Sequence, residues 1–193
     1  MGQRHQVILL LPKVQYSQKN NPNNRAAQAI AIHHQWLYGK SAVFFLKQFL
    51  TWYKNAGRPE GETVPYYIGF GTKEATAVLK AAYSFNAEEG YYHETHELES
   101  TNPKTFDNND GVTMIDLRQP EQPKYCFFAL KGGYEANENA KAYEPHSARQ
   151  YQTYYDVEEW PDIGDLAKVM TKEEFKSGLR LAKKKQAAPN VNI

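Results

Sequence analysis

This chain has a single cysteine and no long apolar run, and these two shortages narrow the classes of protein to which it belongs. With Cys126 alone, no disulfide can form within the chain. No apolar segment approaches the roughly 20 residues that a membrane-spanning helix needs. The sequence therefore predicts a soluble, intracellular protein of a reducing compartment, with no membrane span.

Net charge is also nearly absent. The chain carries 23 lysines and arginines against 22 aspartates and glutamates, which gives a formal charge of +1. This balance provides no broad attraction to nucleic acid or to a membrane surface, although a local basic patch is compatible with it. The 193 residues fit one domain, with a mobile loop over residues 15–24 and a frayed tail over residues 187–193.

Apolar patterning predicts an α+β fold in which a mixed or antiparallel sheet of about five strands packs against three or more helices. Residues 26–38 fit either element, because their alanines favour a helix while alternating apolar residues favour a strand; we prefer the strand. An antiparallel meander is the natural pairing of the last three strands. The predicted strands cover residues 6–11, 26–38, 64–68, 91–98, 112–118 and 124–130, and the predicted helices cover residues 40–56, 73–84 and a segment after Thr171.

The last helix has the clearest local signals. Thr171 and Glu174 have the spacing of a capping box, and Met170 with Phe175 fits a hydrophobic staple around it. Gly178 lies inside the same helix, where glycine costs about 1 kcal/mol relative to alanine. We therefore expect another element to approach this helix closely at Gly178.

No complete catalytic motif is present. The segment His93-Glu94-Thr95-His96-Glu97 lacks the four-residue histidine spacing of zinc peptidases. One of its histidines, with Glu94, could join His33 or His34 in a metal site, but spacing alone does not show this. Cys126 lies in an apolar strand, which favours a buried, inert thiol. The sequence assigns no catalytic residue, metal or cofactor, and favours a protein that is not an enzyme.

Aromatic residues are abundant, with 14 tyrosines and 3 tryptophans. Tyrosine offers a large contact area with a polar tip, which suits a protein interface. The alternative is that these rings fix a long loop onto the domain. Phe44 also lies among Lys40, Lys47 and Lys54 on the predicted helix over residues 40–56, a pattern compatible with nucleic-acid binding. The candidate interface residues are Phe44, Tyr134, Tyr143, Tyr151, Tyr154 and Tyr155.

Two short segments carry a family resemblance, Arg4-His5-Gln6-Val7 and His33-His34-Gln35-Trp36-Leu37-Tyr38-Gly39. They resemble an uncharacterised family of large amoebal DNA viruses of the marseillevirus type, with similar fungal proteins. The resemblance implies an origin and no mechanism. If the two segments pair as neighbouring strands, His5 lies beside His33 or His34. The candidate functional cluster is therefore Arg4, His5, His33, His34, Trp36 and Tyr38.

Three hypotheses follow. The first is a viral accessory or particle-packaged interaction protein that contacts itself, as a homodimer, or a host protein through its tyrosine-rich surface. It would act in the host cytoplasm or nucleus, or in the virion. The alternative is a metal-dependent or hydrolytic enzyme that uses clustered histidines. The second alternative is nucleic-acid binding by the lysine-bearing face of the helix over residues 40–56.

Overall fold

The computed structural model describes twelve segments of the chain, and only these are discussed below. They are residues 4–11, 29–35, 37–56, 79–83, 85–86, 91–92, 95–98, 100–105, 108–119, 121–131, 141–155 and 160–183. The predicted strand over residues 64–68, the predicted loop 15–24 and the predicted tail 187–193 lie outside them.

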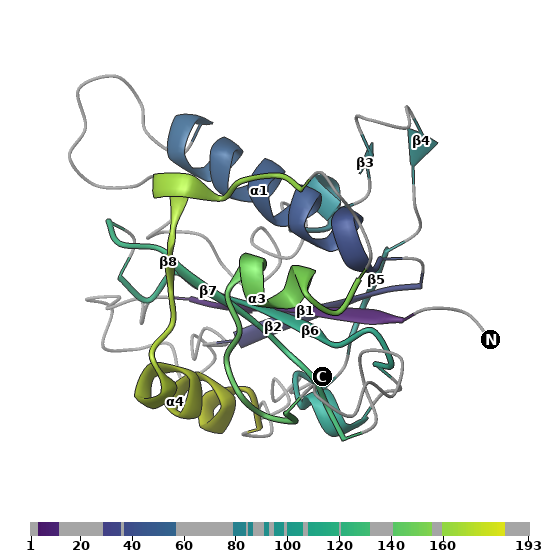
Figure 1. Ribbon diagram of the computed structural model, residues 1–193, viewed down its shortest axis with the longest axis vertical. Helices are drawn as coiled ribbons and strands as arrows, with labels where there is room; N and C mark the ends of the chain where they lie inside the picture. The colour runs from purple at the N-terminus through teal and green to yellow at the C-terminus, as the bar shows by residue number, and fades with distance from the viewer. Residues whose placement is uncertain are drawn as a thin grey trace, which may run out of the picture.

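The described residues form strands, three labelled α-helices and two short 3₁₀ turns (Figure 1). The strands are β1 (His5–Leu10), β2 (Ala29–His34), β3 (Phe85–Asn86), β4 (Tyr91–Tyr92), β5 (Thr95–Glu97), β6 (Val112–Asp116), β7 (Lys124–Phe128) and β8 (Lys168–Val169). The helices are α1 (Gly39–Ala56), α3 (Ala148–Gln152) and α4 (Lys172–Lys183), the 3₁₀ turns are η2 (Pro103–Thr105) and η3 (Gly164–Leu166), and residues 79–83 are also helical.

The main sheet is mixed, as predicted, and has the strand order β5-β2-β1-β6-β7-β8. The pairs β1–β6 and β7–β8 are parallel, and the other three pairs are antiparallel. β3 and β4 form a separate two-stranded ladder. The preference for a strand over residues 26–38 is confirmed for β2.

The predicted meander is wrong in one of its two pairings. β6 and β7 are antiparallel neighbours, but β5 pairs with β2, on the far side of β1. The reason lies in β1, whose six residues are all buried. A strand that is apolar on both faces takes a central position, where two neighbouring strands and two covering layers exclude water from it.

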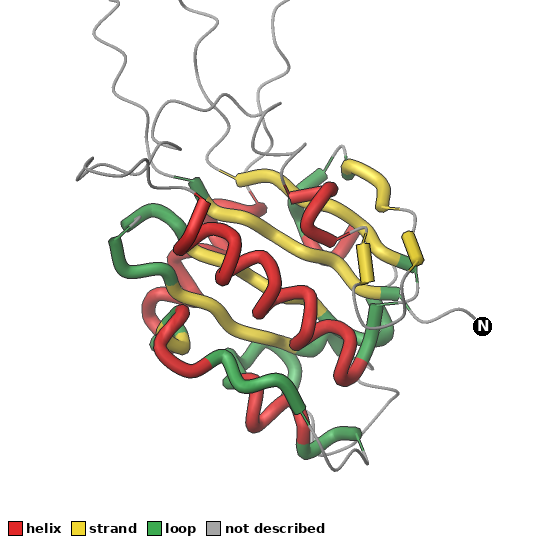
Figure 2. Tube along the Cα trace, turned by 90° about the horizontal axis from the view of Figure 1, so that it is seen from above, coloured by secondary structure: helices red, strands yellow, loops and turns green. Residues whose placement is uncertain are grey.

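The sheet separates two hydrophobic clusters. Val7 and Leu9 of β1 belong to the cluster beneath α1 and α3, whereas Ile8 and Leu10 belong to the cluster beneath α4. This division follows the alternation of side chains along a strand. Figure 1 shows α1 and α4 on opposite faces of the sheet, and Figure 2, seen from above, shows α1 lying across the strands.

α1 forms where the sequence predicts it, because large apolar residues recur at helical spacing. Phe45 and Phe49 are buried at the centre of that spacing, and Tyr83 stacks on Phe45 with ring centroids 5.7 Å apart. None of the described helices is long and apolar enough to cross a membrane.

α4 begins at the predicted capping box. The backbone N–H of Thr171 donates to Glu174 Oε2 at 2.9 Å, and the backbone N–H of Glu174 donates to Thr171 Oγ1 at 3.3 Å. Met170 and Phe175 are buried in the same hydrophobic cluster, as a staple requires. Both predicted features are therefore confirmed, and they fix where the helix starts.

Gly178 allows α4 to approach the sheet closely, as predicted. A Cβ atom at this position would lie 2.7 Å from Leu10 Cδ1 and 2.8 Å from Met114 Sδ. Both of these residues are fully buried, so neither side chain has free space to move into.

We expect Gly178→Ala to lower the free energy of unfolding by about 1–2 kcal/mol. Overpacking costs about 1–3 kcal/mol, and the better helix propensity of alanine offsets up to about 1 kcal/mol of it. Urea unfolding measures the change. The control is the same substitution in a Leu10→Val background, which shortens one of the two opposing side chains and should reduce the penalty. A stabilising effect of Gly178→Ala in the wild-type background would contradict the close approach.

Candidate functional site

The structure brings the two resemblance segments together at one end of the sheet. The Cα register of β1 and β2 pairs His5 with His34 and Gln6 with His33, so the predicted neighbourhood of the histidines is confirmed. Tyr38 is 41% exposed just before α1. Trp36 lies outside the described residues.

His5 is sealed in this cluster as a neutral group. Its side chain is fully buried, its Nδ1 lies 3.1 Å from the carbonyl oxygen of Asp110, and its Nε2 lies 2.7 Å from Thr113 Oγ1. A carbonyl only accepts, so Nδ1 donates and Nε2 accepts from the Thr113 hydroxyl. Burial lowers the pKa of His5 to about 3; the bond to Asp110 opposes this shift, and nearby His33 adds to it. With both ring nitrogens engaged and no access to solvent, His5 has a structural role.

Asp110 connects several residues at this end of the molecule, although its place before Gly111 in the sequence is typical only of a turn. Besides the bond to His5, its carbonyl lies 3.4 Å from the Tyr151 hydroxyl, and its Oδ1 lies 3.4 Å from the Tyr155 hydroxyl. The backbone N–H of Gly39, at the start of α1, donates to the Tyr151 hydroxyl at 3.1 Å. Asp110 therefore joins the histidine segments to the tyrosine segment.

One residue of the candidate interface, Tyr151, belongs to the hydrophobic core. Tyr151 is fully buried and stacks on Phe127 with ring centroids 4.3 Å apart. This position contradicts a docking role for Tyr151, because a packed core ring has no surface to offer a partner. The alternative, in which tyrosines fix a long segment onto the domain, describes Tyr151. Phe44, Tyr143, Tyr154 and Tyr155 are half-buried, and Tyr134 lies outside the described residues.

The metal hypothesis gains no ligand set from the described residues. Among them, no group of three or more histidine, cysteine, aspartate or glutamate side chains is arranged to hold a metal ion. The backbone register places His96 opposite His33, whereas His93 and Glu94 lie outside the described residues. Cys126 is fully buried as predicted, with Sγ 3.6 Å from Met170 Sδ, and burial raises the pKa of its thiol.

The lysine side chains on the predicted face of α1 differ in how far they are exposed to solvent. Lys40 and Lys47 are half-buried, and only Lys54 of the three is exposed. Phe44 leans inward, edge-on to Phe45 with ring centroids 5.9 Å apart. α1 therefore exposes less of the predicted lysine and aromatic surface than its sequence suggests.

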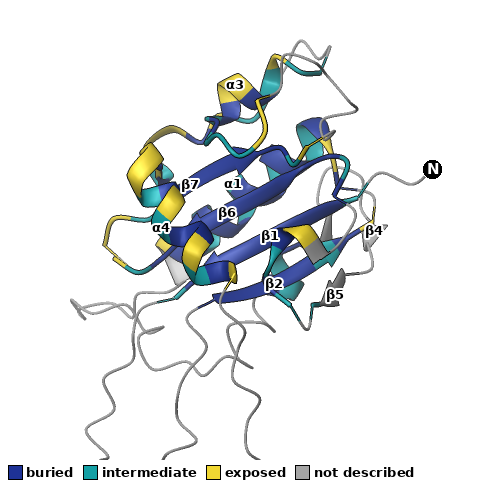
Figure 3. Cartoon of the chain, turned by 90° about the horizontal axis from the view of Figure 1, so that it is seen from below, coloured by how far each residue is buried: buried dark blue, intermediate teal, exposed yellow. Residues whose placement is uncertain are grey.

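The outer face of α4 carries the exposed basic surface instead. The exposed basic side chains of the helix are Lys172, Lys176, Arg180 and Lys183, and the exposed acidic side chain is Glu173. Spacings of four, four and three residues place the four cations on one side of the helix, over about 16 Å at the helical rise. Figure 3 shows exposed residues on the side of α4 that faces away from the sheet.

Three of these cations have no ion-pair partner among the residues that the structure describes. Lys172 pairs with Glu144 at 3.3 Å, whereas Lys176, Arg180 and Lys183 form no ion pair within the described residues. The chain is almost neutral as a whole, so this surface is locally positive although the net charge of the chain is close to zero.

The basic surface continues beyond the helix through Tyr143. Lys104 Nζ and Lys183 Nζ lie 5.2 Å and 5.6 Å from the centroid of the Tyr143 ring. Tyr143 has a φ of 60°, a left-handed backbone conformation that non-glycine residues rarely adopt. The ring thereby holds one lysine from η2 and one from α4 on the same part of the surface. We call the set Lys104, Lys176, Arg180 and Lys183 the α4 basic face.

A scan against protein-family models found no match, and no match was found among the curated proteins or the solved structures.

Proposed function

We propose that this chain is a non-catalytic interaction protein that binds the phosphate backbone of a nucleic acid through the α4 basic face. The observation that carries the proposal is the row of exposed cations on α4, three of which have no ion-pair partner within the described residues. When cations without an internal partner neutralise phosphates, the counterions condensed on the nucleic acid are released. This release drives non-specific nucleic-acid binding.

The position of the α4 basic face favours nucleic-acid binding over a protein interface formed by the tyrosine-rich surface. The apolar side of α4 is buried against the sheet, so the helix presents its basic side as a fixed, convex surface. Large exposed apolar side chains are scarce in the described residues, where Tyr38 and Val169 are the examples. Protein interfaces rely on desolvated aromatic anchors, and this surface offers charge in their place.

The proposal retains the interaction role expected from the sequence and changes the surface that performs it. An intracellular, virus-associated setting belongs to the same proposal, and its support is the resemblance of the two short segments. Catalysis has less support, because His5 is neutral and enclosed, and no described residues form a metal-ligand group.

The test is fluorescence anisotropy with labelled single-stranded and duplex oligonucleotides over a salt series that starts at about 50 mM. We expect binding whose affinity falls steeply with salt. Replacing Lys176 and Arg180 with glutamine should lower the slope of log affinity against log salt by roughly 2, or about one for each lost phosphate contact. Both side chains are exposed, so the variant should fold normally.

Lys54→Gln provides the matched control, because it removes one exposed cation from α1, on the opposite face of the sheet. It should leave the slope unchanged. A labelled polyglutamate chain separates the other partner class: binding of this chain without oligonucleotide binding would show that the partner is an acidic protein. If neither probe binds at low salt, the proposed function is wrong.

A further inference from the structure

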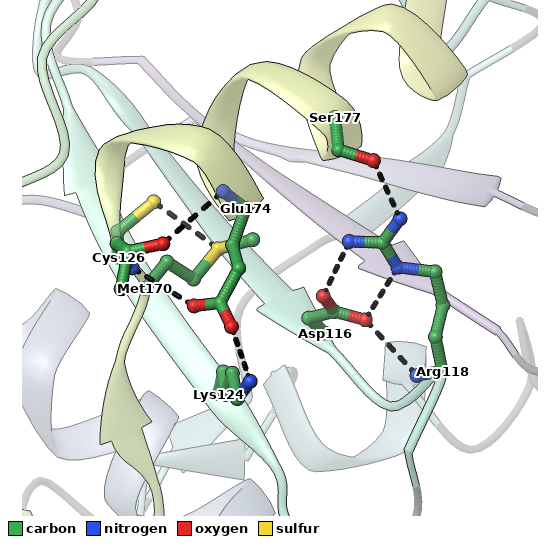
Figure 4. A network of polar contacts seen from close by, with 8 residues as sticks. Asp116, Arg118, Lys124, Cys126, Met170, Glu174 and Ser177 are labelled. Atoms are coloured by element: carbon green, nitrogen blue, oxygen red, sulfur yellow. Dashed lines mark hydrogen bonds and ion pairs between the residues drawn. The ribbon is translucent and has the colours of Figure 1, made fainter.

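A second polar site lies in a cleft on the other side of α4 from its exposed face. The cleft encloses about 360 Å³ where β6 ends, β7 begins and the first turns of α4 pass over both strands (Figure 4). The side chains that line it are Asp116, Arg118, Gln119, Gln122, Lys124 and Glu174. The carboxyl ends of the parallel strands β1 and β6 meet here, since the N–H of Leu117 donates to the carbonyl of Leu10 at 2.9 Å. Ligands commonly bind at such carboxyl ends.

Arg118 is held rigidly from two sides. Its Nε and Nη2 donate to the two carboxylate oxygens of Asp116 at 2.9 and 2.7 Å, and its Nη1 donates to Ser177 Oγ of α4 at 3.1 Å. The bond to Asp116 is the main cause that raises the pKa of Arg118, so the group is a permanent cation. A guanidinium has five N–H donors, and within the described residues three of them are used.

Lys124, at the start of the neighbouring strand β7, is also oriented by a carboxylate. Its ammonium donates to Glu174 Oε1, while Glu174 Oε2 accepts from the N–H of Thr171 in the capping box. The bond to Lys124 is the main cause that lowers the pKa of Glu174. Of the three N–H donors of Lys124, one is used within the described residues.

The two acids are therefore occupied by positioning the two bases. Asp116 accepts three hydrogen bonds from Arg118, counting the Arg118 backbone N–H at 3.0 Å. The two bases retain two donors each. The Arg118 and Lys124 side chains are 29% and 19% exposed, so they reach the solvent that fills the cleft. Gln119 and Gln122 add amide donors at its rim.

We infer that this cleft binds a small oxyanion, a carboxylate or a phosphate, between the free donors of Arg118 and Lys124. A guanidinium held by Asp116 and Ser177 keeps one N–H donor on each Nη, and these donors can form charge-assisted hydrogen bonds to such a group. Asp116 holds Arg118 in this orientation. The volume suits a ligand of metabolite size and excludes a folded partner. The inference is independent of the α4 basic face, because Arg118 and Lys124 do not belong to it.

The experiment titrates inorganic phosphate and, separately, acetate into the full chain at constant ionic strength, followed by isothermal calorimetry and by amide chemical shifts. We expect saturable shifts at the amides of Arg118 and Lys124 with at least one of the probes. Response to phosphate alone assigns a phosphorylated ligand, and response to acetate alone assigns a carboxylate ligand. No saturable shift with either probe overturns the inference.

Three variants separate recognition from stability. Arg118→Gln should weaken binding by about tenfold or more, because charge-assisted bonds are the strong class. Glu174→Gln retains a residue suited to the capping box but removes a negative charge beside Lys124, so binding should tighten. A purely structural cleft would show no such gain. Lys54→Gln removes an equal charge from α1, on the opposite face of the sheet, and should leave binding unchanged; an equal loss in this variant would overturn the inference.

Discussion

Replacing Tyr151 with alanine is expected to lower the free energy of unfolding by about 3–5 kcal/mol, as for other large buried aromatics. The ring is fully buried, and it stacks on Phe127 beneath α1. Tyr151→Phe keeps the ring and removes the hydroxyl. It should still cost about 1–3 kcal/mol, because the N–H of Gly39 loses its acceptor in a buried place. Urea unfolding of both variants measures the two effects.

Tyr143→Phe is the control for the tyrosine prediction. Within the described residues the Tyr143 hydroxyl makes no hydrogen bond, so its removal should change stability by less than about 0.5 kcal/mol. A stable, folded Tyr151→Ala protein would contradict the packing described here. If that stable variant had also lost binding to a partner, the tyrosine interface expected from the sequence would be supported.

Much of the fold could be predicted because its signals are local. The capping box at Thr171 and the apolar spacing of α1 involve neighbours in sequence, and both are confirmed. Gly178 predicted the close approach of α4 to the sheet, because glycine lowers the stability of a helix and close packing explains its presence there. α3 was missed although it begins with a capping box of its own, Ser147 with Gln150, a signal that a search for this spacing would have found.

The pairing of strands could not be predicted in the same way. β1 and β6 are parallel neighbours although about 100 residues separate them, and nothing local in β6 favours β1 over β5. The site shares this difficulty. Asp110 reads as a turn residue before Gly111, and only the sheet register brings it to His5 and Tyr155.

The solvent exposure of the basic side chains could not be predicted from the sequence pattern either. The basic residues of α1 and of α4 each fall on one side of their helix, but in α1 only Lys54 of the predicted stripe is exposed, whereas Lys176 and Arg180 of α4 are open to solvent. The amount of covering that each helix receives depends on the rest of the chain. A basic stripe in sequence therefore becomes a binding surface only where the fold leaves it uncovered.

Stability is expected to fall as the pH drops below about 6.5, and His5 is a main cause. Burial lowers the pKa of His5 in the folded protein to about 3, while the unfolded chain protonates this residue near its ordinary value of 6.5. Between these values the unfolded state binds one more proton than the folded state. The contribution of His5 to stability is thus complete above pH 6.5 and is lost progressively as the pH falls towards 3. The slope is on the order of 1 kcal/mol per pH unit.

His5→Asn tests this origin of the pH dependence. An asparagine amide can still donate towards the Asp110 carbonyl, but the acceptor for Thr113 is lost, so at neutral pH the variant should be less stable by about 1–3 kcal/mol. Wild type and variant should then converge as the pH falls, because only the wild type has a buried imidazole at position 5 to protonate. Urea unfolding from about pH 7 to about pH 4 measures both curves.

His146→Gln separates the effect of His5 from that of His146, a second buried histidine whose pKa is lowered. Burial lowers the pKa of His146 in the same direction, so this variant should also reduce the slope, but by less than His5→Asn because His146 is not fully buried. Carboxylates titrate in the same range, and they cancel when each variant is compared with wild type at the same pH. Parallel curves for His5→Asn and wild type would mean that His5 is charged or exposed in the folded protein. In that case the alternative of an enzyme that uses clustered histidines would gain support.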